Sequence, residues 1–148
     1  MKKLFTNNPL FFAFLFPALV DAIWTIAGQD SSYWQNPQSA REGGPLYYIL
    51  VTSPFLYMLL AVLWFIFLYW LLKKLKSPYN LIVAIMFISG HTWGSSTWII
   101  KSLSQSPMLV SVSYREIFLV EWTVMAVYCI IIAVFAGLSI NYYFTHKK

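Results

Sequence analysis

Four long apolar stretches, separated by charged or turn-forming segments, decide what this chain can fold into. A helix needs roughly 20 apolar residues to cross a bilayer core of about 30 Å. The stretches at 9–28, 46–72, 79–103 and 117–144 all reach that length. Of the 148 residues, 59% are hydrophobic and 10% are charged, so little sequence is left for a soluble domain. We therefore predict an all-α membrane protein, in which four transmembrane helices form one domain over residues 1–148.

Basic residues are distributed unevenly among the segments that flank these stretches. Seven are predicted on one side of the membrane and three on the other. The seven are Lys2, Lys3, Lys73, Lys74, Lys76, Lys147 and Lys148, and the three are Arg41, Lys101 and Arg115. Because cytoplasmic loops carry the excess of lysine and arginine, both termini and the turn at 73–78 are predicted to be cytoplasmic. This placement accounts for the net charge of +5, and we expect no nucleic-acid partner.

The first stretch has a competing interpretation as a secretory signal peptide. Lys2 and Lys3 before an apolar run resemble the start of such a peptide. No cleavage site with small residues precedes Asp21, and the chain continues without a polar break as Ala22-Ile23-Trp24. We therefore expect this segment to be retained as the first helix. The membrane is then the endoplasmic reticulum in a eukaryote, or the plasma membrane in a bacterium.

Three ionisable residues lie inside apolar stretches, where charged groups are costly and usually face the interior of a bundle. They are Asp21 in the first stretch, His91 in the third and Glu121 in the fourth. The predicted topology allows all three to share the outer half of the membrane. An isolated buried carboxylate is strongly disfavoured, so we predict that Asp21 pairs with His91 at the floor of an outward-facing cavity. Glu121 is near enough to the interface to reach water or Arg115 instead.

Aromatic and hydroxyl side chains recur beside these positions at helical spacing. Trp24 follows Asp21 by three residues. Ser95 and Trp98 continue the helix face of His91 at intervals of four and three residues. Such spacing predicts a polar cavity with aromatic walls. The predicted ligand-binding residues are Trp24, Tyr57, Trp93, Ser95 and Trp98.

Other chemistries find little support in the pattern. The single cysteine, Cys129, offers neither a disulfide framework nor a thiolate metal site. His91 and His146 lie at different depths and cannot be two axial haem ligands, and no cluster has metal spacing, so we expect no metal and no cofactor. Ser95 lies one turn from His91 but lacks the sequence context of a serine nucleophile. Gly90-x-x-x-Gly94 is interpreted as a close-packing surface between helices.

The middle of the chain carries a recognisable series of motifs. An aromatic-rich second stretch with Leu63-Trp64 leads into a basic turn, residues 71–78, that ends in proline. The third stretch then contains Ile88-Ser89-Gly90-His91-Thr92-Trp93-Gly94. This series resembles the EXPERA family. The resemblance implies a four-helix, often dimeric bundle around a cavity for a sterol or a cationic amphiphile.

The resemblance also implies roles for single residues. In the family's isomerases an acid protonates a ring double bond, and a second group removes a proton from the neighbouring carbon. Asp21 would match the helix-one acid, Glu121 would fall near the helix-four polar residue, and His91 would match the polar residue of the third helix. Pro17 stands where the isomerases have a histidine, and their acid in helix two has no counterpart here. The catalytic set is therefore incomplete relative to the family.

Three functions follow from these observations. The first is binding of a sterol-like lipid or another lipid or cationic amphiphile in the intramembrane cavity. The second is a double-bond isomerase that uses Asp21 or Glu121 as the acid and His91 as the base. The third is a non-catalytic accessory or structural subunit of a membrane complex, in which the polar groups only lock helices together.

Overall fold

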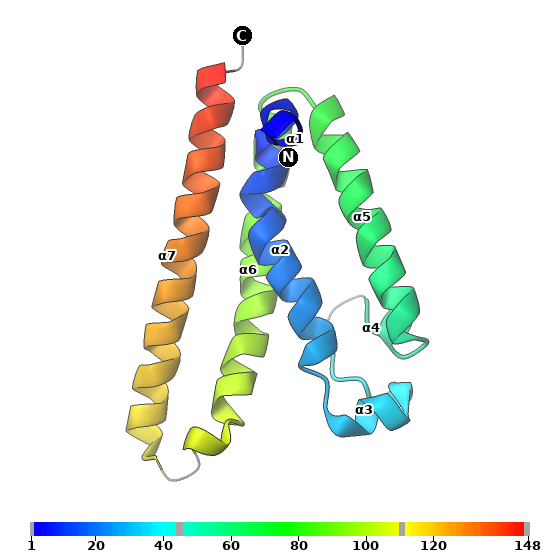
Figure 1. The fold of residues 1–148 in the computed structure, drawn as a ribbon, viewed down its shortest axis with the longest axis vertical. Helices are drawn as coiled ribbons and strands as arrows, with labels where there is room; N and C mark the ends of the chain where they lie inside the picture. The colour runs from blue at the N-terminus through cyan, green and yellow to red at the C-terminus, as the bar shows by residue number, and fades with distance from the viewer. Residues whose placement is uncertain (1, 44–45, 110–111, 147–148) are drawn as a thin grey trace.

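The computed structural model describes residues 2–43, 46–109 and 112–146, and every regular element within these ranges is a helix (Figure 1). The long helices are α2 (Pro9–Ala27), α5 (Pro54–Lys74), α6 (Tyr79–Ser104) and α7 (Tyr114–His146). The short ones are α1 (Lys2–Asn7), α3 (Ser31–Gln35), η1 (Pro37–Ser39), α4 (Tyr47–Leu50) and η2 (Pro107–Leu109). The predicted all-α class is confirmed for the described residues. Lys147 and Lys148 of the topology prediction lie outside them.

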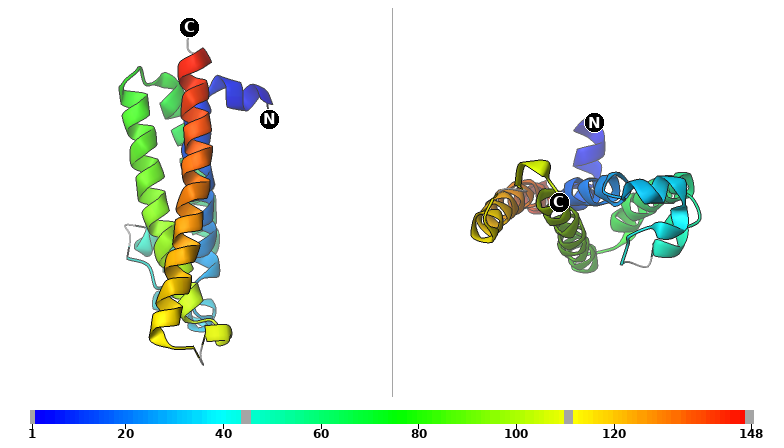
Figure 2. Two further views of the ribbon diagram at one scale, coloured as in Figure 1. Left: turned by 90° about the vertical axis from the view of Figure 1, so that its left-hand side faces the viewer. Right: turned by 90° about the horizontal axis from the view of Figure 1, so that it is seen from below.

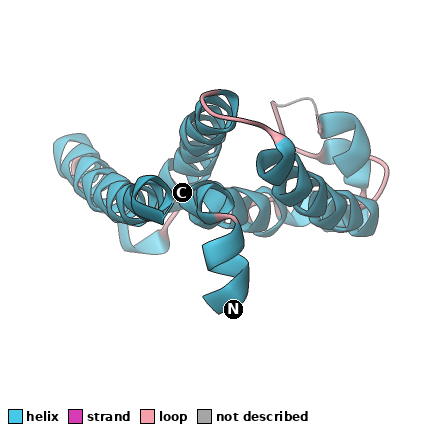
Figure 3. Ribbon diagram, turned by 90° about the horizontal axis from the view of Figure 1, so that it is seen from above, coloured by secondary structure: helices cyan, strands magenta, loops and turns pink. Residues whose placement is uncertain are grey.

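The four long helices run along the long axis of the molecule, and α2 contacts each of the other three (Figures 1 and 3). The α5–α6 turn and the ends of α1 and α7 share one end of the molecule (Figure 1). We call this the lysine end, because Lys73, Lys74 and Lys76 lie at that turn. α1 turns sideways away from the long helices there (Figure 2). The opposite end carries α3, α4 and η2 and is called the loop end.

Three of the long helices are long and apolar enough to cross a membrane, namely α2, α5 and α7. They indicate an integral membrane protein. α6 is not among them, although it has 26 residues. Its half toward the loop end is rich in residues that lower its hydropathy: Ser89, Gly90, His91, Thr92, Gly94, Ser95, Ser96 and Thr97. By length and composition, the described residues thus support three of the four predicted transmembrane helices.

The stretch predicted as one helix at 46–72 is divided in the structure. α4 ends at Leu50 and α5 begins at Pro54. Ser53 caps α5, since its Oγ accepts a hydrogen bond from the backbone N–H of Leu56 at 3.4 Å. Proline suits the first turn of a helix because its missing N–H would have no intrahelical partner there. A new helix therefore starts at Pro54, inside the stretch that was predicted as one helix.

The half of the molecule toward the lysine end has an apolar core to which all four long helices contribute. Its buried residues are Leu10, Phe11, Phe14, Ala18, Leu68, Leu72, Ala84 and Tyr143. Aromatic rings meet edge to face within it, with Phe11 5.3 Å from Phe14 and 5.2 Å from Tyr69 between ring centroids. The outer surfaces of α5 and α7 carry many exposed apolar side chains. Such surfaces suit contact with lipid.

At the loop end, ionic contacts and hydrogen bonds connect α6 to the end of α2 and to the loop that follows it. Asp30 Oδ2 lies 2.8 Å from Arg41 Nε, and Asp30 Oδ1 lies 3.3 Å from Lys101 Nζ. Lys101 also donates a hydrogen bond to the backbone oxygen of Gly28 at 3.0 Å, just beyond the end of α2. A cation near a helix C-terminus is favoured by the helix dipole. Lys101 of α6 therefore holds the last turn of α2 and the following loop together.

Candidate functional site

Asp21 of α2 and His91 of α6 are in direct contact. Asp21 Oδ2 and His91 Nδ1 are 2.8 Å apart, and both side chains are partly buried. A carboxylate only accepts hydrogen bonds, so the proton in this contact belongs to Nδ1 when Asp21 is ionised. The structure thus brings together the two residues whose pairing the sequence predicted. Their predicted roles in binding or catalysis stay predictions.

Gly94 allows α2 and α6 to approach closely at this pair. A Cβ atom at Gly94 would lie 2.6 Å from Asp21 Oδ1 and 2.9 Å from Asp21 Cγ, which is too close for any side chain. A Cβ at Gly90 would meet nothing within 4 Å. The predicted close-packing surface therefore exists at Gly94, whereas Gly90 lies on an open part of α6 and packs against no other helix within the described residues.

The imidazole of His91 lies beside two phenylalanine rings in nearly parallel orientation. The ring centroids of Phe14 and Phe87 are 6.4 and 5.9 Å from that of His91, at interplanar angles of 16° and 20°. His91 Nε2 is buried and has no hydrogen-bond partner among the described residues. Leaving a buried polar atom unpaired costs about 1–3 kcal/mol, so Nε2 needs an explanation.

Asp21 is the first of three polar residues spaced by four along α2. The side chain of Thr25 lies near the hydroxyl of Tyr57 of α5. Gln29 bonds the backbone of Arg41, with Arg41 N donating to Gln29 Oε1 at 2.8 Å. Asp21, Thr25 and Gln29 thus form a polar ladder that links α2 to α6, α5 and the following loop. Thr25 and Gln29 were not predicted as site residues, although their spacing of four residues from Asp21 places all three on one face of the helix.

Ser95 is fully buried and connects α6 to α7. Its Oγ donates to the backbone oxygen of His91 at 2.6 Å and lies 2.6 Å from the hydroxyl of Tyr128. Tyr128 was not predicted, because a tyrosine in an apolar helix resembles ordinary packing. The hydroxyl of Ser95 contacts no imidazole nitrogen here, which weakens the nucleophile interpretation.

The aromatic residues predicted around the pair occupy different environments. Tyr57 and Trp98 are buried and Trp24 is half-buried. Trp98 lies beneath Lys101, whose Nζ is 4.7 Å from the ring centroid. Trp93 is 76% exposed, and its predicted place in a cavity wall stays a prediction. It follows His91 by two residues, which puts the two side chains on different faces of a helix.

Glu121 is bound separately from the pair. Its Oε1 accepts a hydrogen bond from Ser104 Oγ at 2.6 Å, near the end of α6. Within the described residues, no contact joins Glu121 to Asp21, His91 or Arg115. The sequence placed Glu121 correctly toward the loop end but missed Ser104 as its partner.

Two surface pockets lie away from the Asp21–His91 pair. One, of about 440 Å³, lies at the lysine end. The other, of about 240 Å³, is a groove on α7 alone, beside Leu119 and Thr123. Neither contains a residue of the predicted ligand-binding set, so the predicted cavity around the pair stays a prediction. Across the described ranges, no group of three metal-ligating side chains comes together.

Comparison of this chain with protein-family models, with curated proteins and with solved structures gave no match. The resemblance to the EXPERA family therefore rests on the sequence motifs alone. The structure supports the coarser description, an all-helical chain with three long apolar helices.

Proposed function

We propose that this chain is an integral membrane protein in which all four long helices cross the bilayer, with the lysine end in the cytoplasm. α6 packs along α2 and runs between the same two ends of the molecule as α5 and α7 (Figure 1). Its 26 residues span about 39 Å at 1.5 Å per residue, which exceeds the bilayer core of about 30 Å. A helix in this position crosses the membrane together with its neighbours.

The polar side chains of α6 are compatible with such a crossing because most of them are already paired. Thr92, Ser96 and Thr97 donate to backbone oxygens of their own helix at 2.6–2.7 Å. His91 and Ser95 bind side chains of α2 and α7. Polar groups in lipid must find partners within the protein, and these groups do so.

We infer that the Asp21–His91 pair binds the polar group of a lipid or a cationic amphiphile. The observation that supports this is the buried, unpartnered Nε2 of His91. If Nδ1–H donates to the Asp21 carboxylate, Nε2 is a free acceptor and the pair carries one negative charge. A hydroxyl or ammonium group would supply the missing donor, and an ammonium would also be attracted by the charge. Phe14 and Phe87 offer apolar contacts beside it.

Binding has more support than isomerisation. An isomerase needs a proton donor and a proton acceptor that both reach the substrate. Asp21 and His91 are bonded to one another, and Glu121 is bonded to Ser104 at the end of α6. The isomerase hypothesis would require this arrangement to change when a substrate binds.

Native mass spectrometry with lipid extraction on the detergent-purified protein tests the binding proposal. Wild type is expected to retain a lipid or amphiphile, and Asp21→Asn and His91→Ala are expected to lose about 90% of it, a tenfold drop worth about 1.4 kcal/mol. The matched control is Thr97→Val on the same helix, because the exposed Thr97 bonds only its own helix. Equal retention in all four proteins, or none in wild type, would contradict the proposal.

A second candidate function, an accessory subunit, is favoured by one observation on α6. Gly90 has open space at its Cβ position, and the neighbouring Met86 and Trp93 are exposed. Small residues in a membrane helix let another helix approach closely. Purification from native membranes would then yield a stoichiometric second membrane protein that Gly90→Ile fails to retain. A monodisperse homodimer with bound lipid would count against this candidate.

A further inference from the structure

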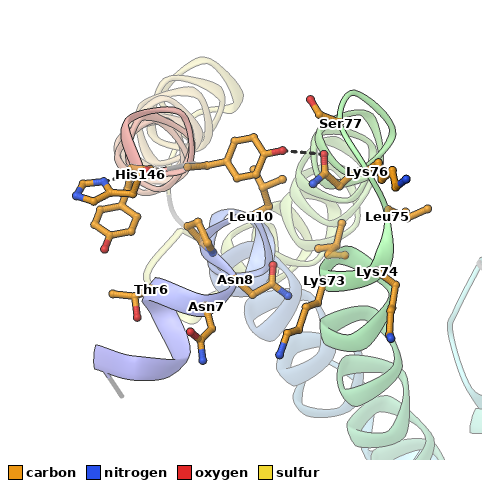
Figure 4. Close-up of a pocket in the computed structure, with 15 residues that line it drawn as sticks. Thr6, Asn7, Asn8, Leu10, Lys73, Lys74, Leu75, Lys76, Ser77 and His146 are labelled. Atoms are coloured by element: carbon orange, nitrogen blue, oxygen red, sulfur yellow. Dashed lines mark hydrogen bonds between the residues drawn. The ribbon is translucent and has the colours of Figure 1, made fainter. Parts of the chain in front are cut away.

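A pocket of about 440 Å³ at the lysine end brings together segments far apart in the sequence (Figure 4). The end of α1, the α5–α6 turn and the last turns of α7 all contribute to its lining. In the close-up, Lys73 extends on the side of α5 that faces Asn7 and Asn8, whereas Lys76 extends to the other side of the turn. The pocket is thus formed by the tertiary fold.

The lining of this pocket is positively charged and contains no carboxylate. Lys73, Lys74 and Lys76 line it, and within the described residues none of them forms an ion pair. All five acidic residues lie in the parts of the chain nearer the loop end: Asp21, Asp30, Glu42, Glu116 and Glu121. An anion in the pocket would therefore meet the ammonium group of Lys73 without competition from acidic side chains.

Asn80 lines the same pocket and supplies a hydrogen-bond donor to it. Only 5% of this residue is exposed, and its Oδ1 accepts a hydrogen bond from the hydroxyl of Tyr143 at 3.1 Å. Its Nδ2 has no partner among the described residues. Asn8, also in the lining, uses its Nδ2 to bond the backbone oxygen of Tyr69 at 2.7 Å. Asn80 thus offers an unpaired N–H group beside the lysines, where an acceptor oxygen would satisfy it.

The pocket lies at the level expected for lipid head groups. Trp70 precedes the lysines by one turn of α5 and Tyr79 opens α6, and both are exposed at the lysine end. Exposed tryptophan and tyrosine gather where a membrane meets water. Basic pockets between membrane helices on the cytoplasmic side suit anionic head groups.

We propose that this pocket binds the phosphodiester group of an anionic phospholipid of the cytoplasmic leaflet. Lys73 would neutralise its charge, and Asn80 Nδ2 would donate to a phosphate oxygen. This inference rests on the proposed function only in that the lysine end must face the cytoplasm. It does not require a ligand at Asp21 and His91, so an experiment can disprove one site without disproving the other. Inorganic phosphate shares the chemistry of the phosphodiester and is a separate arm of the test.

The test measures lipid binding by native mass spectrometry of the full-length protein, titrated with equal amounts of dioleoyl phosphatidylglycerol and dioleoyl phosphatidylcholine. Wild type is expected to bind phosphatidylglycerol in preference. Lys73→Gln is expected to reduce that preference about fivefold, as one lysine near an anionic surface contributes about 1 kcal/mol. The matched control is Arg115→Gln, because Arg115 is an exposed cation near the loop end. This control should leave the preference unchanged.

A second variant tests whether Asn80 belongs to the lipid site. Asn80→Asp keeps an oxygen for the hydroxyl of Tyr143, but it replaces the N–H donor with an acceptor and places a negative charge inside the pocket. It should weaken phosphatidylglycerol binding while the helical content measured by circular dichroism is kept. Equal binding of the two lipids, an equal loss in Arg115→Gln, unchanged binding in Asn80→Asp, or binding of inorganic phosphate in place of the lipid would each overturn the proposal.

Discussion

The two halves of this molecule hold their helices together in different ways. Toward the lysine end, the four long helices share a core of aromatic and aliphatic side chains. Toward the loop end, α2 is linked to its neighbours by the polar ladder of Asp21, Thr25 and Gln29. Lipid is as apolar as the core, so helix association in a membrane depends on close packing and on hydrogen bonds. The lysine half relies mainly on close packing, whereas the loop half combines hydrogen bonds with a smaller apolar cluster of Tyr33, Leu50 and Tyr57.

This difference has a consequence for function. Apolar packing tolerates exchange of one hydrophobic residue for another of similar volume. A hydrogen-bonded pair needs specific atoms at specific distances and can present them to a ligand. The candidate binding site is therefore the hydrogen-bonded pair of Asp21 and His91 and not the apolar core of the lysine half.

The largest loss of stability is expected when a buried side chain of the lysine half is shortened. Leu68→Ala removes a side chain that is fully buried in the core and should lower the free energy of unfolding by about 2–3 kcal/mol. Unfolding in mixed micelles, followed by circular dichroism, measures the loss. The control is Ile66→Ala on the same helix, since Ile66 is 61% exposed and should tolerate the change. Equal losses would show that packing does not distinguish the two faces of α5.

A somewhat smaller effect is expected for a methyl group added in the loop half. Gly94→Ala forces the Asp21 carboxylate to move and should cost about 1–3 kcal/mol. The matched change Gly90→Ala enters open space and should be neutral or stabilising by up to about 1 kcal/mol, because alanine favours helix. Thermal unfolding of both variants in one detergent makes the comparison. If Gly90→Ala were more destabilising than Gly94→Ala, the close contact of α6 with α2 at Gly94 would not exist as described.

The coupling between Asp21 and His91 should be about 0.6–1.7 kcal/mol, the range of hydrogen bonds between membrane helices. A double-mutant cycle with Asp21→Asn and His91→Phe measures it, and phenylalanine keeps the ring contacts with Phe14 and Phe87. Additive effects of the two substitutions would mean that the contact between Asp21 and His91 does not stabilise the loop half.

The smallest effect is expected where the loop end meets water. Lys101→Met removes the hydrogen bond to Gly28 and the ion pair with Asp30, and should cost about 1 kcal/mol or less. Raising the salt concentration should reduce part of the difference from wild type, because salt screens an ion pair that water still partly reaches. Arg115→Met is the control and should change stability little. A loss that does not depend on salt would assign the role of Lys101 to its contact with Trp98 instead.

The sequence predicted the parts of the fold that depend on composition along the chain. Long apolar runs and flanking lysines were enough for the helices at the first, third and fourth stretches, within a few residues at their ends. The break before Pro54 was missed, since an apolar run of 27 residues hides a cap formed by a single serine. The third stretch was predicted to cross the membrane although its loop-end half is polar. The hydropathy of α6 alone does not identify it as a membrane-spanning helix.

The candidate site was predictable where one rare residue type stood out. Two ionisable residues in apolar helices predicted the contact of Asp21 with His91. Trp93 was assigned to the same cavity by proximity in sequence, but the angular spacing of a helix turns it outward. Tyr128, the partner of Ser95, is one of ten tyrosines, and its inward orientation follows only from how α7 packs on α6.

Nitrogen-15 NMR of histidine can observe both nitrogens of His91, because the chain has only two histidines and His146→Gln leaves His91 as the single signal. In the delipidated protein, the Nδ1 resonance of His91 should show its hydrogen bond to Asp21. The Nε2 resonance should then shift when total lipid extract of the source membrane is added. If the extract leaves the Nε2 resonance unchanged, or if Asp21→Asn does not alter the Nδ1 resonance, the Asp21–His91 pair is not the lipid site proposed above.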